Sequence, residues 1–247
     1  MDNKSQIRQS LTARHHATLF AYIVKSSIDI FGNDCIQTLE NGIRRYGNQR
    51  GYRMAQRALK DRNKLDILSY LIYGEWESAP NEMQIDFYIS SSDVNMTASK
   101  CSWYDEWNKE NLLRYGVLYC DFVDAALLEG FNPELKLDLL EHRTKGAKNC
   151  DFYFRDGNLN IEEINEASRT NKLLGKTTKK HWDYHIGHIY KTLKQELEKD
   201  FRDEGLRALR NALEMYREKY GQEVYEILLE FEDTNFDIVD DYESIII

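Results

Sequence analysis

The sequence predicts an α+β fold in which long helices pack on one antiparallel sheet of about four strands, built from two β-hairpins. Apolar residues recur at helical spacing through most of the 247 residues, while alternating patterns occur in two short regions. The two prolines, Pro80 and Pro133, leave the chain free for long helices. A composition that is 42% hydrophobic suits a large core. We therefore expect a single domain spanning 1–247, or at most two intertwined subdomains.

The first predicted helix covers residues 5–31 and ends at Gly32. Leu11, Leu19 and later apolar residues give it an approximate 3.6-residue period. His15 and His16 lie inside this helix, and we interpret them as surface or interface histidines.

The second predicted helix runs from Asp34, an expected N-cap, to about Asp61. It places Gly47 and Gly51 four residues apart on one face. Four arginines flank these glycines: Arg44, Arg45, Arg50 and Arg53. One interpretation is an anion site for a substrate carboxylate. The other is a helix crossing with a solvated basic edge.

Residues 83–89 and 94–103 predict the first β-hairpin, because apolar and polar side chains alternate and Ser90–Asp93 supplies a turn. Residues 150–155 and 158–164 predict the second hairpin around Asp156-Gly157, a pair typical of a type I′ turn. In the first of these strands Cys150, Phe152 and Phe154 should share one side.

Between the hairpins we expect a helix over 108–128, with Gly130 after its end. Asn132 and Pro133 are typical of a new helix start, so a further helix should run to about Gly146. After a polar linker over 166–178, three more helices are expected: one beginning near Trp182, one over 203–220 and one over 223–231. Residues 233–247 form either a docked terminal strand or a partner-binding tail.

Composition and motifs exclude several classes of protein. A net charge of −9 argues against nucleic-acid binding, which needs excess Lys and Arg. No apolar run approaches 18 residues, and the first ten residues lack the basic-then-apolar layout of a signal peptide, so no membrane association is expected. The four cysteines have no C-x-x-C spacing, which favours reduced thiols and a cytoplasmic location. No phosphate-binding glycine motif occurs, and we expect no cofactor.

Cys120 and Asp124 stand one helical turn apart. A thiol nucleophile needs a base or a cation beside it, and an adjacent carboxylate alone would raise the thiol pKa. The candidate bases come from elsewhere in the chain: His142, His181, His185 or His188. The alternative is a buried apolar cysteine beside surface aspartates.

His181, His185 and His188 follow i, i+4 and i+7 spacing and should form one stripe on a helix. Three interpretations stay open. With Asp124 the three histidines could ligate a metal. They could instead act in metal-free acid–base chemistry or substrate binding, or they could be solvated or core side chains.

Several short motifs occur in an order that resembles the L-2-amino-thiazoline-4-carboxylic acid hydrolase family. They are Y-C-x-x-V-D at 119–124, G-F-N-P at 130–133, R-T at 143–144 with Gly146, and C-D-F at 150–152. Y-G-x-x-R-G at 46–51 and W-D-Y-H-x-x-H at 182–188 also match. The resemblance covers about 34–195, the expected hydrolase core. Residues 200–247 would form a helical C-terminal extension with an acidic and apolar tail. The spacer Lys145–Asn149 is shorter than the family's, which should reshape the pocket wall.

The resemblance implies a cytoplasmic hydrolase that cleaves a C–N bond in a small cyclic amidine-like or thiazoline carboxylic acid. Such a reaction needs a nucleophile or an activated water, an acid for the leaving nitrogen and an anchor for the carboxylate. Our hypothesis is that Cys120 is the nucleophile, His185 or His188 the acid–base group, and Asp124 the orienting group or amidinium partner. Arg50 or Arg143 would anchor the carboxylate. Further substrate-binding residues would be Asn132, Thr144, Cys150, Asp151 and Trp182.

Two other functions remain open beside this one. One is a non-catalytic protein that binds a small ligand or a partner on the same fold, and the other is a metal hydrolase using His181, His185, His188 and Asp124. The expected partner is a small-molecule substrate, and a homo-oligomer is left open.

Overall fold

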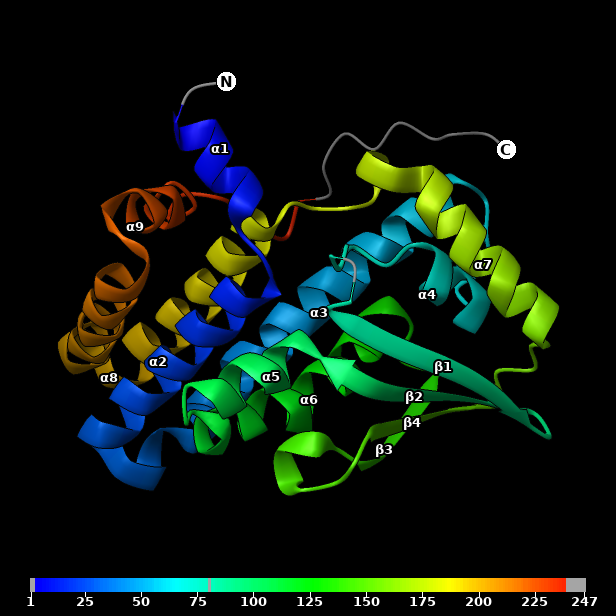
Figure 1. The fold of residues 1–247 in the computed structure, drawn as a ribbon, viewed down its shortest axis with the longest axis horizontal. Helices are drawn as coiled ribbons and strands as arrows, with labels where there is room; N and C mark the ends of the chain where they lie inside the picture. The colour runs from blue at the N-terminus through cyan, green and yellow to red at the C-terminus, as the bar shows by residue number, and fades with distance from the viewer. Residues whose placement is uncertain (1–2, 80, 239–247) are drawn as a thin grey trace. The chain divides into compact units, whose positions relative to one another are not determined.

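The computed structural model describes residues 3–79 and 81–238, and the chain divides into two compact units. Unit 1 comprises Met1–Tyr46, Ser102–Phe122 and His181–Thr234, and unit 2 comprises Gly47–Cys101, Val123–Lys180 and Asn235–Ile247. Two helices, α3 (Ile36–Lys60) and α6 (Leu113–Phe131), begin in unit 1 and end in unit 2 (Figure 1).

All the regular elements among the described residues of unit 1 are helices. Besides the first parts of α3 and α6, its elements are α1 (Asn3–Ser10), α2 (Ala13–Phe31), η1 (Gly32–Cys35), α5 (Ser102–Lys109), α8 (Trp182–Tyr220) and α9 (Gln222–Leu229). Helix α2 packs along α8 and against α5, and α9 packs on α8. Their contact buries apolar side chains such as Leu19, Ile23, Ile189 and Leu193, whose helical spacing points them to one core.

The predicted single helix over 5–31 is wrong, because the chain breaks at Thr12. Thr12 has extended backbone angles, and its side chain accepts a hydrogen bond from the Arg14 amide at 3.3 Å. The Thr12 amide in turn donates to Nδ1 of His15 at 3.2 Å, which completes a capping box. The surface interpretation is also wrong for His16, which is fully buried. It lies one turn before Phe20 on the face that α2 turns to the core.

The structure joins the helix expected from Trp182 and the helix expected over 203–220 into one long helix, α8, which is kinked once. Arg202 has a φ of 51°, which is outside the helical region. The predicted boundary therefore falls at the kink. Helix α9 confirms the helix expected over 223–231.

Unit 2 contains an antiparallel sheet of order β1-β2-β4-β3, which confirms the predicted α+β class (Figure 1). Its strands are β1 (Met83–Ser90), β2 (Asp93–Cys101), β3 (Lys136–Glu141) and β4 (Cys150–Arg155). The remaining elements of the unit are α4 (Ile67–Ile72), η2 (Arg143–Lys145), α7 (Ile161–Leu174) and η3 (Gly175–Thr177). Strands β1 and β2 form the first predicted hairpin, with Ser90 opposite Asp93.

Three of the elements predicted in unit 2 are wrong. The helix expected from Asn132 to Gly146 is replaced by β3, in which Leu137 and Leu139 alternate with polar residues and pair with β4. The strand expected over 158–164 and the linker over 166–178 are largely helix α7. Asn160 caps α7, because its side chain accepts a hydrogen bond from the Glu163 amide. The Asn160 amide in turn donates to Oε2 of Glu163 at 2.8 Å. This N-x-x-E capping box was the missed signal.

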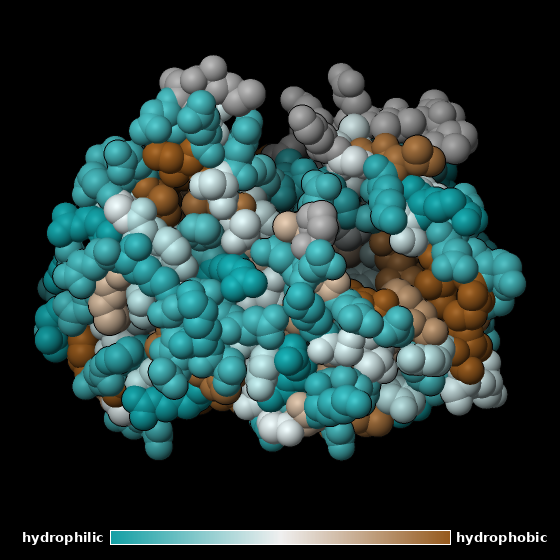
Figure 2. Space-filling model, viewed as in Figure 1, coloured by the Kyte–Doolittle hydropathy of each residue, from teal (hydrophilic) through white to brown (hydrophobic). Residues whose placement is uncertain are grey.

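The central strands of the sheet carry the core of unit 2. Cys150, Phe152 and Phe154 are buried on one side of β4, as predicted, and pack with residues of β2, α4, α6 and α7. Strand β1 forms an edge, and Ile85 and Tyr88 on it are exposed. Figure 2 shows hydrophobic residues gathered where β1 and α7 lie in Figure 1.

Glycines allow α3 and α6 to cross closely in unit 2, which confirms the predicted crossing at Gly47 and Gly51. A Cβ atom on Gly51 would lie 2.1 Å from the Leu127 carbonyl oxygen, and one on Gly130 would lie 2.2 Å from the Asn48 carbonyl oxygen. The prediction of a solvated basic edge is wrong for Arg50 and Arg53, because both side chains are buried.

Among the helices of residues 3–79 and 81–238, none is both long and apolar enough to cross a membrane. The prediction for the tail falls mostly on residues 239–247, which lie outside the described residues.

Candidate active site

Asp124 is the group of unit 2 whose pKa best suits proton transfer near neutral pH. It lies on α6, and its side chain keeps partial exposure. Burial raises the pKa of its carboxyl group to about 6, while the nearby charge of Arg50 lowers it by a smaller amount. Tyr70 belongs to the same neighbourhood, because its pKa is raised by burial and by the Asp124 charge. The Asp124 carboxyl can therefore gain or lose a proton near neutral pH.

Arg50 belongs to a buried charged cluster that α3 presents to Glu75. Arg53 contacts both oxygens of Glu75, with Nε to Oε1 at 3.0 Å and Nη2 to Oε2 at 2.9 Å. Arg57 donates from Nη1 to Oε1 at 2.8 Å, and Nε of Arg50 lies 3.6 Å from Oε2. The arginine charges hold the pKa of Glu75 well below its usual range against the effect of burial. The spacing i, i+3, i+7 puts all three arginines on one face of α3.

Cys150 begins β4 with its side chain in the core of unit 2. The Arg143 amide donates to its sulfur at 3.4 Å. Burial raises the pKa of the thiol, and the Asp124 charge raises it further. The Cys150 thiol is therefore protonated at neutral pH and is a poor nucleophile there. Thr144, beside Arg143 in η2, has its hydroxyl 2.6 Å from Nδ1 of His142.

Asn132 and Asp151, both predicted to bind substrate, make contacts that hold the fold of unit 2. The Asn132 side chain donates to the Leu65 carbonyl at 2.7 Å and accepts from the Glu134 amide at 3.0 Å. Asp151 accepts a cross-strand bond from the Thr97 hydroxyl at 2.7 Å. These contacts fix the chain after α6 and the pairing of β2 with β4.

Of the histidines considered as bases, His142 lies in unit 2, whereas His181, His185 and His188 lie in unit 1 with Trp182. His185 and His188 are fully buried on α8. The His185 ring lies 5.3 Å from that of Trp182, and the His188 ring lies 4.6 Å from that of Tyr46. His181 precedes the helix instead of lying within it, is half exposed, and contacts Asp183 at 3.1 Å. No three His, Cys, Asp or Glu side chains within the described residues are grouped to hold a metal ion.

Cys120 lies on α6 in unit 1, is half-buried and forms no disulfide. Within that unit the sequence-predicted site residues are Cys120, His181, Trp182, His185 and His188. In unit 2 the structure brings Asp124 close enough to both Arg50 and Cys150 for its charge to act on each of them. The other predicted residues of unit 2 are Asn132, Arg143, Thr144 and Asp151.

Sequence reasoning missed His16, which lies at the centre of an aromatic cluster in unit 1. Nε1 of Trp103 donates to Nδ1 of His16 at 3.1 Å, so the His16 ring accepts at this nitrogen. The rings of Tyr46, Tyr119 and Trp182 surround it at centroid distances of 5.4 to 6.2 Å. These residues come from different helices, so only tertiary packing reveals the cluster.

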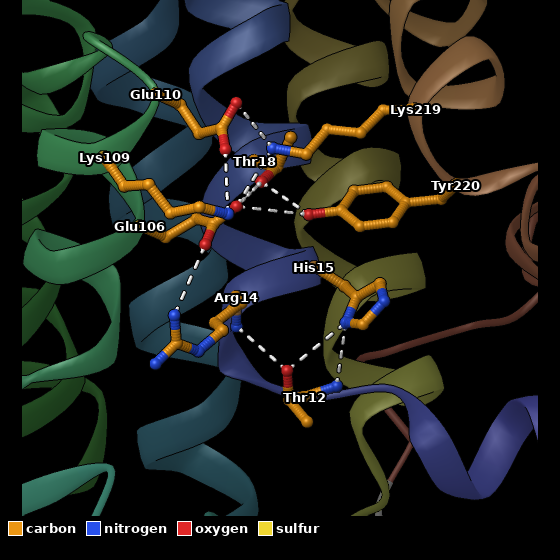
Figure 3. A network of polar contacts seen from close by, with 9 residues as sticks. All are labelled: Thr12, Arg14, His15, Thr18, Glu106, Lys109, Glu110, Lys219 and Tyr220. Carbon is orange, nitrogen blue, oxygen red and sulfur yellow. Dashed lines mark hydrogen bonds and ion pairs between the residues drawn. The ribbon is translucent and has the colours of Figure 1, made fainter.

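A second polar network in unit 1 surrounds the buried carboxylate of Glu106 (Figure 3). Lys219 reaches Glu106 and Glu110, each at 3.0 Å, and the Thr18 hydroxyl donates to Glu106 at 3.3 Å. His15 lies close by, and burial lowers its pKa to about 4. The network joins α2, α5 and the end of α8, and we assign it to the stability of unit 1.

Comparison with known proteins identifies the family. A family model described as L-2-amino-thiazoline-4-carboxylic acid hydrolase matches residues 12–154. The match begins earlier than the expected 34 and ends before the W-D-Y-H motif, so it includes Arg50, Asp124 and Cys150 but not His185. No curated protein and no solved structure matches the chain. Because the match covers more than half of the 247 residues, the chain belongs to the L-2-amino-thiazoline-4-carboxylic acid hydrolase family.

Proposed function

We propose that this chain hydrolyses a C–N bond in a small cyclic amidine-like acid, with a 2-aminothiazoline-4-carboxylate as the substrate type. The family description supplies the substrate class. The observation that carries the proposal is the Asp124 carboxyl, whose pKa of about 6 lets it act as a base and then as an acid.

The proposed site in unit 2 binds the amidinium end of such a substrate through a carboxylate and its carboxylate end through a guanidinium group. At neutral pH most of Asp124 is ionised, because its pKa lies below 7. One carboxylate oxygen accepts a hydrogen bond from the exocyclic amino group of the amidinium, and the other faces the attacking water. A guanidinium group, from Arg50 or Arg143, anchors the substrate carboxylate at the opposite end.

The reaction then proceeds by addition of water and ring opening. The water oxygen bonds to the amidinium carbon and gives a proton to Asp124. Asp124 returns this proton to the ring nitrogen as the C–N bond breaks. The ring nitrogen leaves as an amine. The hydroxyl group of the intermediate then becomes a carbonyl, and its proton is transferred to that amine. The product is a ring-opened carbamoyl-cysteine.

A thiol mechanism for the same reaction is a separate proposal. The Cys120 thiolate would attack the amidinium carbon, and the ring C–N bond would break as His185 or His188 protonates the leaving nitrogen. Water would then add to the enzyme-bound carbon and expel the Cys120 thiolate, which leaves the carbamoyl product. The partial exposure of Cys120, which forms no disulfide, supports this mechanism because a substrate can reach a side chain that is not fully buried. Under this mechanism Cys120→Ala should abolish turnover, and iodoacetamide should modify Cys120 in the wild-type chain. Full turnover by Cys120→Ala would rule it out.

The function is tested by incubating the purified chain with 2-aminothiazoline-4-carboxylate and analysing the product by mass. We expect a gain of one water and a new primary amine. Appearance of a free thiol instead would mean that the C–S bond breaks, against the proposal. Binding without turnover would favour the non-catalytic alternative, and loss of turnover with a chelator would favour the metal alternative.

Asp124→Asn should abolish this turnover, because the amide cannot accept a proton. Glu129→Gln is the matched control, since Glu129 is an exposed carboxylate on the same helix, α6. Equal turnover by both variants would remove Asp124 from the mechanism.

A further inference from the structure

Strand β1 is an edge of the unit 2 sheet that exposes apolar side chains. Among the described residues it pairs with β2 alone, so its outer side carries no ladder of strand hydrogen bonds. Ile85 and Ile89 are 41% and 36% exposed. Edge strands of soluble proteins are usually blunted by lysine, proline or a bulge. β1 has neither lysine nor proline between Met83 and Ser90, and the extra residue in its pairing with β2, Ser99, belongs to β2. The outer side of β1 is therefore a regular template for another strand.

The exposed isoleucines of β1 lie on the face of the sheet that carries the core. Ile85, Phe87 and Ile89 share this face, because side chains alternate along a strand. Phe87 packs against the core cluster that β2, β4 and their neighbouring helices form. Helix α7 contacts β1 and carries two further exposed apolar side chains, Ile161 and Leu173. Exposed apolar side chains of unit 2 thus gather at the β1 edge (Figure 2).

The backbone of β1 presents its hydrogen-bonding groups at the same residues. Ser90 and Asp93 face each other across a two-residue turn, which makes them a hydrogen-bonded pair. Hydrogen-bonded and non-hydrogen-bonded pairs alternate along an antiparallel ladder, and the register is unbroken from Ile85 to Ser90. Ile85, Phe87 and Ile89 therefore direct their N–H and C=O groups away from β2, toward the outer side of the sheet.

We propose that the outer sides of β1 from two copies of this chain pair antiparallel about a two-fold axis at Phe87, which joins the two sheets into one of eight strands, four from each copy. In this register Ile85 lies opposite Ile89 of the partner subunit. The residues that direct their backbone groups outward thus meet one another, and their apolar side chains share one face. On the other face Asp86 lies opposite Tyr88 of the partner subunit, whose hydroxyl can donate to the carboxylate.

A second copy suits this edge because β1 is complementary to itself. The apolar residues are spaced symmetrically around Phe87, and pairing extends over 84–90 in both copies. With the axis at Asp86 instead, two carboxylates would lie opposite each other, which destabilises a strand pair. With the axis at Tyr88, only 86–90 would pair. Asp86 is also the only charged side chain within Met83–Ser90, so two chains of net charge −9 approach here with little local repulsion.

The test is the mass of the full chain in solution, measured by sedimentation velocity over a range of concentrations. We expect a dimer of twice 29.2 kDa. Ile85→Lys should weaken association roughly tenfold or more, because it places a lysine at a desolvated apolar pair. Leu140→Lys is the matched control, because Leu140 is an exposed apolar residue on β3, the opposite edge of the same sheet. This variant should dimerise like the wild-type chain.

A covalent cross-link tests the register itself. Asp86 and Tyr88 are exposed, so the double variant Asp86→Cys, Tyr88→Cys should keep the fold. Opposite residues of a non-hydrogen-bonded pair have Cα atoms about 4.5 Å apart, within the range that a disulfide spans. Mild oxidation should therefore link two copies of the double variant through positions 86 and 88, as identified by peptide mass. Asp86→Cys alone should not link, since its counterpart in the other copy lies two positions along the strand.

A monomeric wild-type chain, a dimer that Ile85→Lys leaves intact, or a double variant that does not cross-link would overturn the inference. Dimerisation only after removal of residues 239–247 would assign the β1 edge to that segment and would also overturn it. Ile85→Lys should fold, because the Ile85 side chain is already partly exposed. If it does not fold, the double cysteine variant still decides, since it changes only exposed positions on the opposite face.

Discussion

Asp124→Asn should make the chain more stable at neutral pH while removing its activity. The reason is that an ionised carboxylate in this position is desolvated, and its interaction with Arg50 offsets only part of the cost. Asparagine has almost the same size and carries no charge. The wild-type chain therefore retains an unfavourable charge where the proposed chemistry needs a base.

The size of the effect follows from the shift in pKa, from 3.8 to about 6 on folding. Below pH 4 the carboxyl group is protonated in both the folded and the unfolded chain, so it costs nothing. Between about pH 4 and pH 6 the unfolded chain has lost the proton that the folded chain still holds, and the free energy of unfolding falls as the pH rises. The total fall is about 3 kcal/mol at most, reduced by the partial exposure of the side chain.

The assay is denaturant unfolding of the wild-type chain, Asp124→Asn and the exposed control Glu129→Gln at several pH values from 4 to 8. The stability of Asp124→Asn relative to the wild-type chain should rise through pH 6 and then level off. Glu129→Gln should show no such rise, because Glu129 has no comparable burial. Parallel stability curves for wild type and Asp124→Asn across this range would refute the reasoning.

Two further substitutions test the surroundings of the site. In thermal unfolding, Gly51→Ala should destabilise the chain by about 2 kcal/mol or more, because the new Cβ would lie 2.1 Å from the Leu127 carbonyl oxygen. Gly74→Ala is the control and should be near neutral, because the nearest atom to its new Cβ would lie 3.8 Å away. A normal melting temperature for Gly51→Ala would contradict the close crossing of α3 and α6. Glu75→Gln should cost about 3–5 kcal/mol at pH 7, since it leaves buried guanidinium charges uncompensated. Because the pKa of Glu75 is lowered in the folded chain, its stabilisation is present above about pH 4.5 and is lost as the pH falls below it. If Glu75→Gln lost as much stability at pH 3 as at pH 7, this role of the ionised Glu75 would be contradicted.

Local signals in the sequence predicted the parts of the fold that local interactions determine. The alternation of 83–89 and the turn at Ser90–Asp93 are sufficient for the β1–β2 hairpin. The glycine spacing of α3 predicted a helix crossing, and the structure shows that the partner is α6. By contrast, Pro133 suggested a helix where β3 forms, because pairing with β4 overrides a local helix-start signal.

The candidate site could be predicted only in part for the same reason. Arg50, Asp124 and Cys150 stood out through motifs, and the structure brings them within electrostatic range. Glu75 lies in an irregular segment with no periodic pattern, so its contact with the arginines of α3 depends on tertiary packing. His16 was missed because its role depends on rings contributed by other helices.

The most direct test of the central claim is the pH dependence of kcat/KM for 2-aminothiazoline-4-carboxylate. Because Asp124 must be ionised to accept a proton and its pKa is about 6, kcat/KM should rise about tenfold per pH unit below pH 6 and level off above it. Asp124→Asn should show no measurable turnover at any of these pH values. A profile with no break near pH 6, together with turnover by Asp124→Asn, would contradict the account.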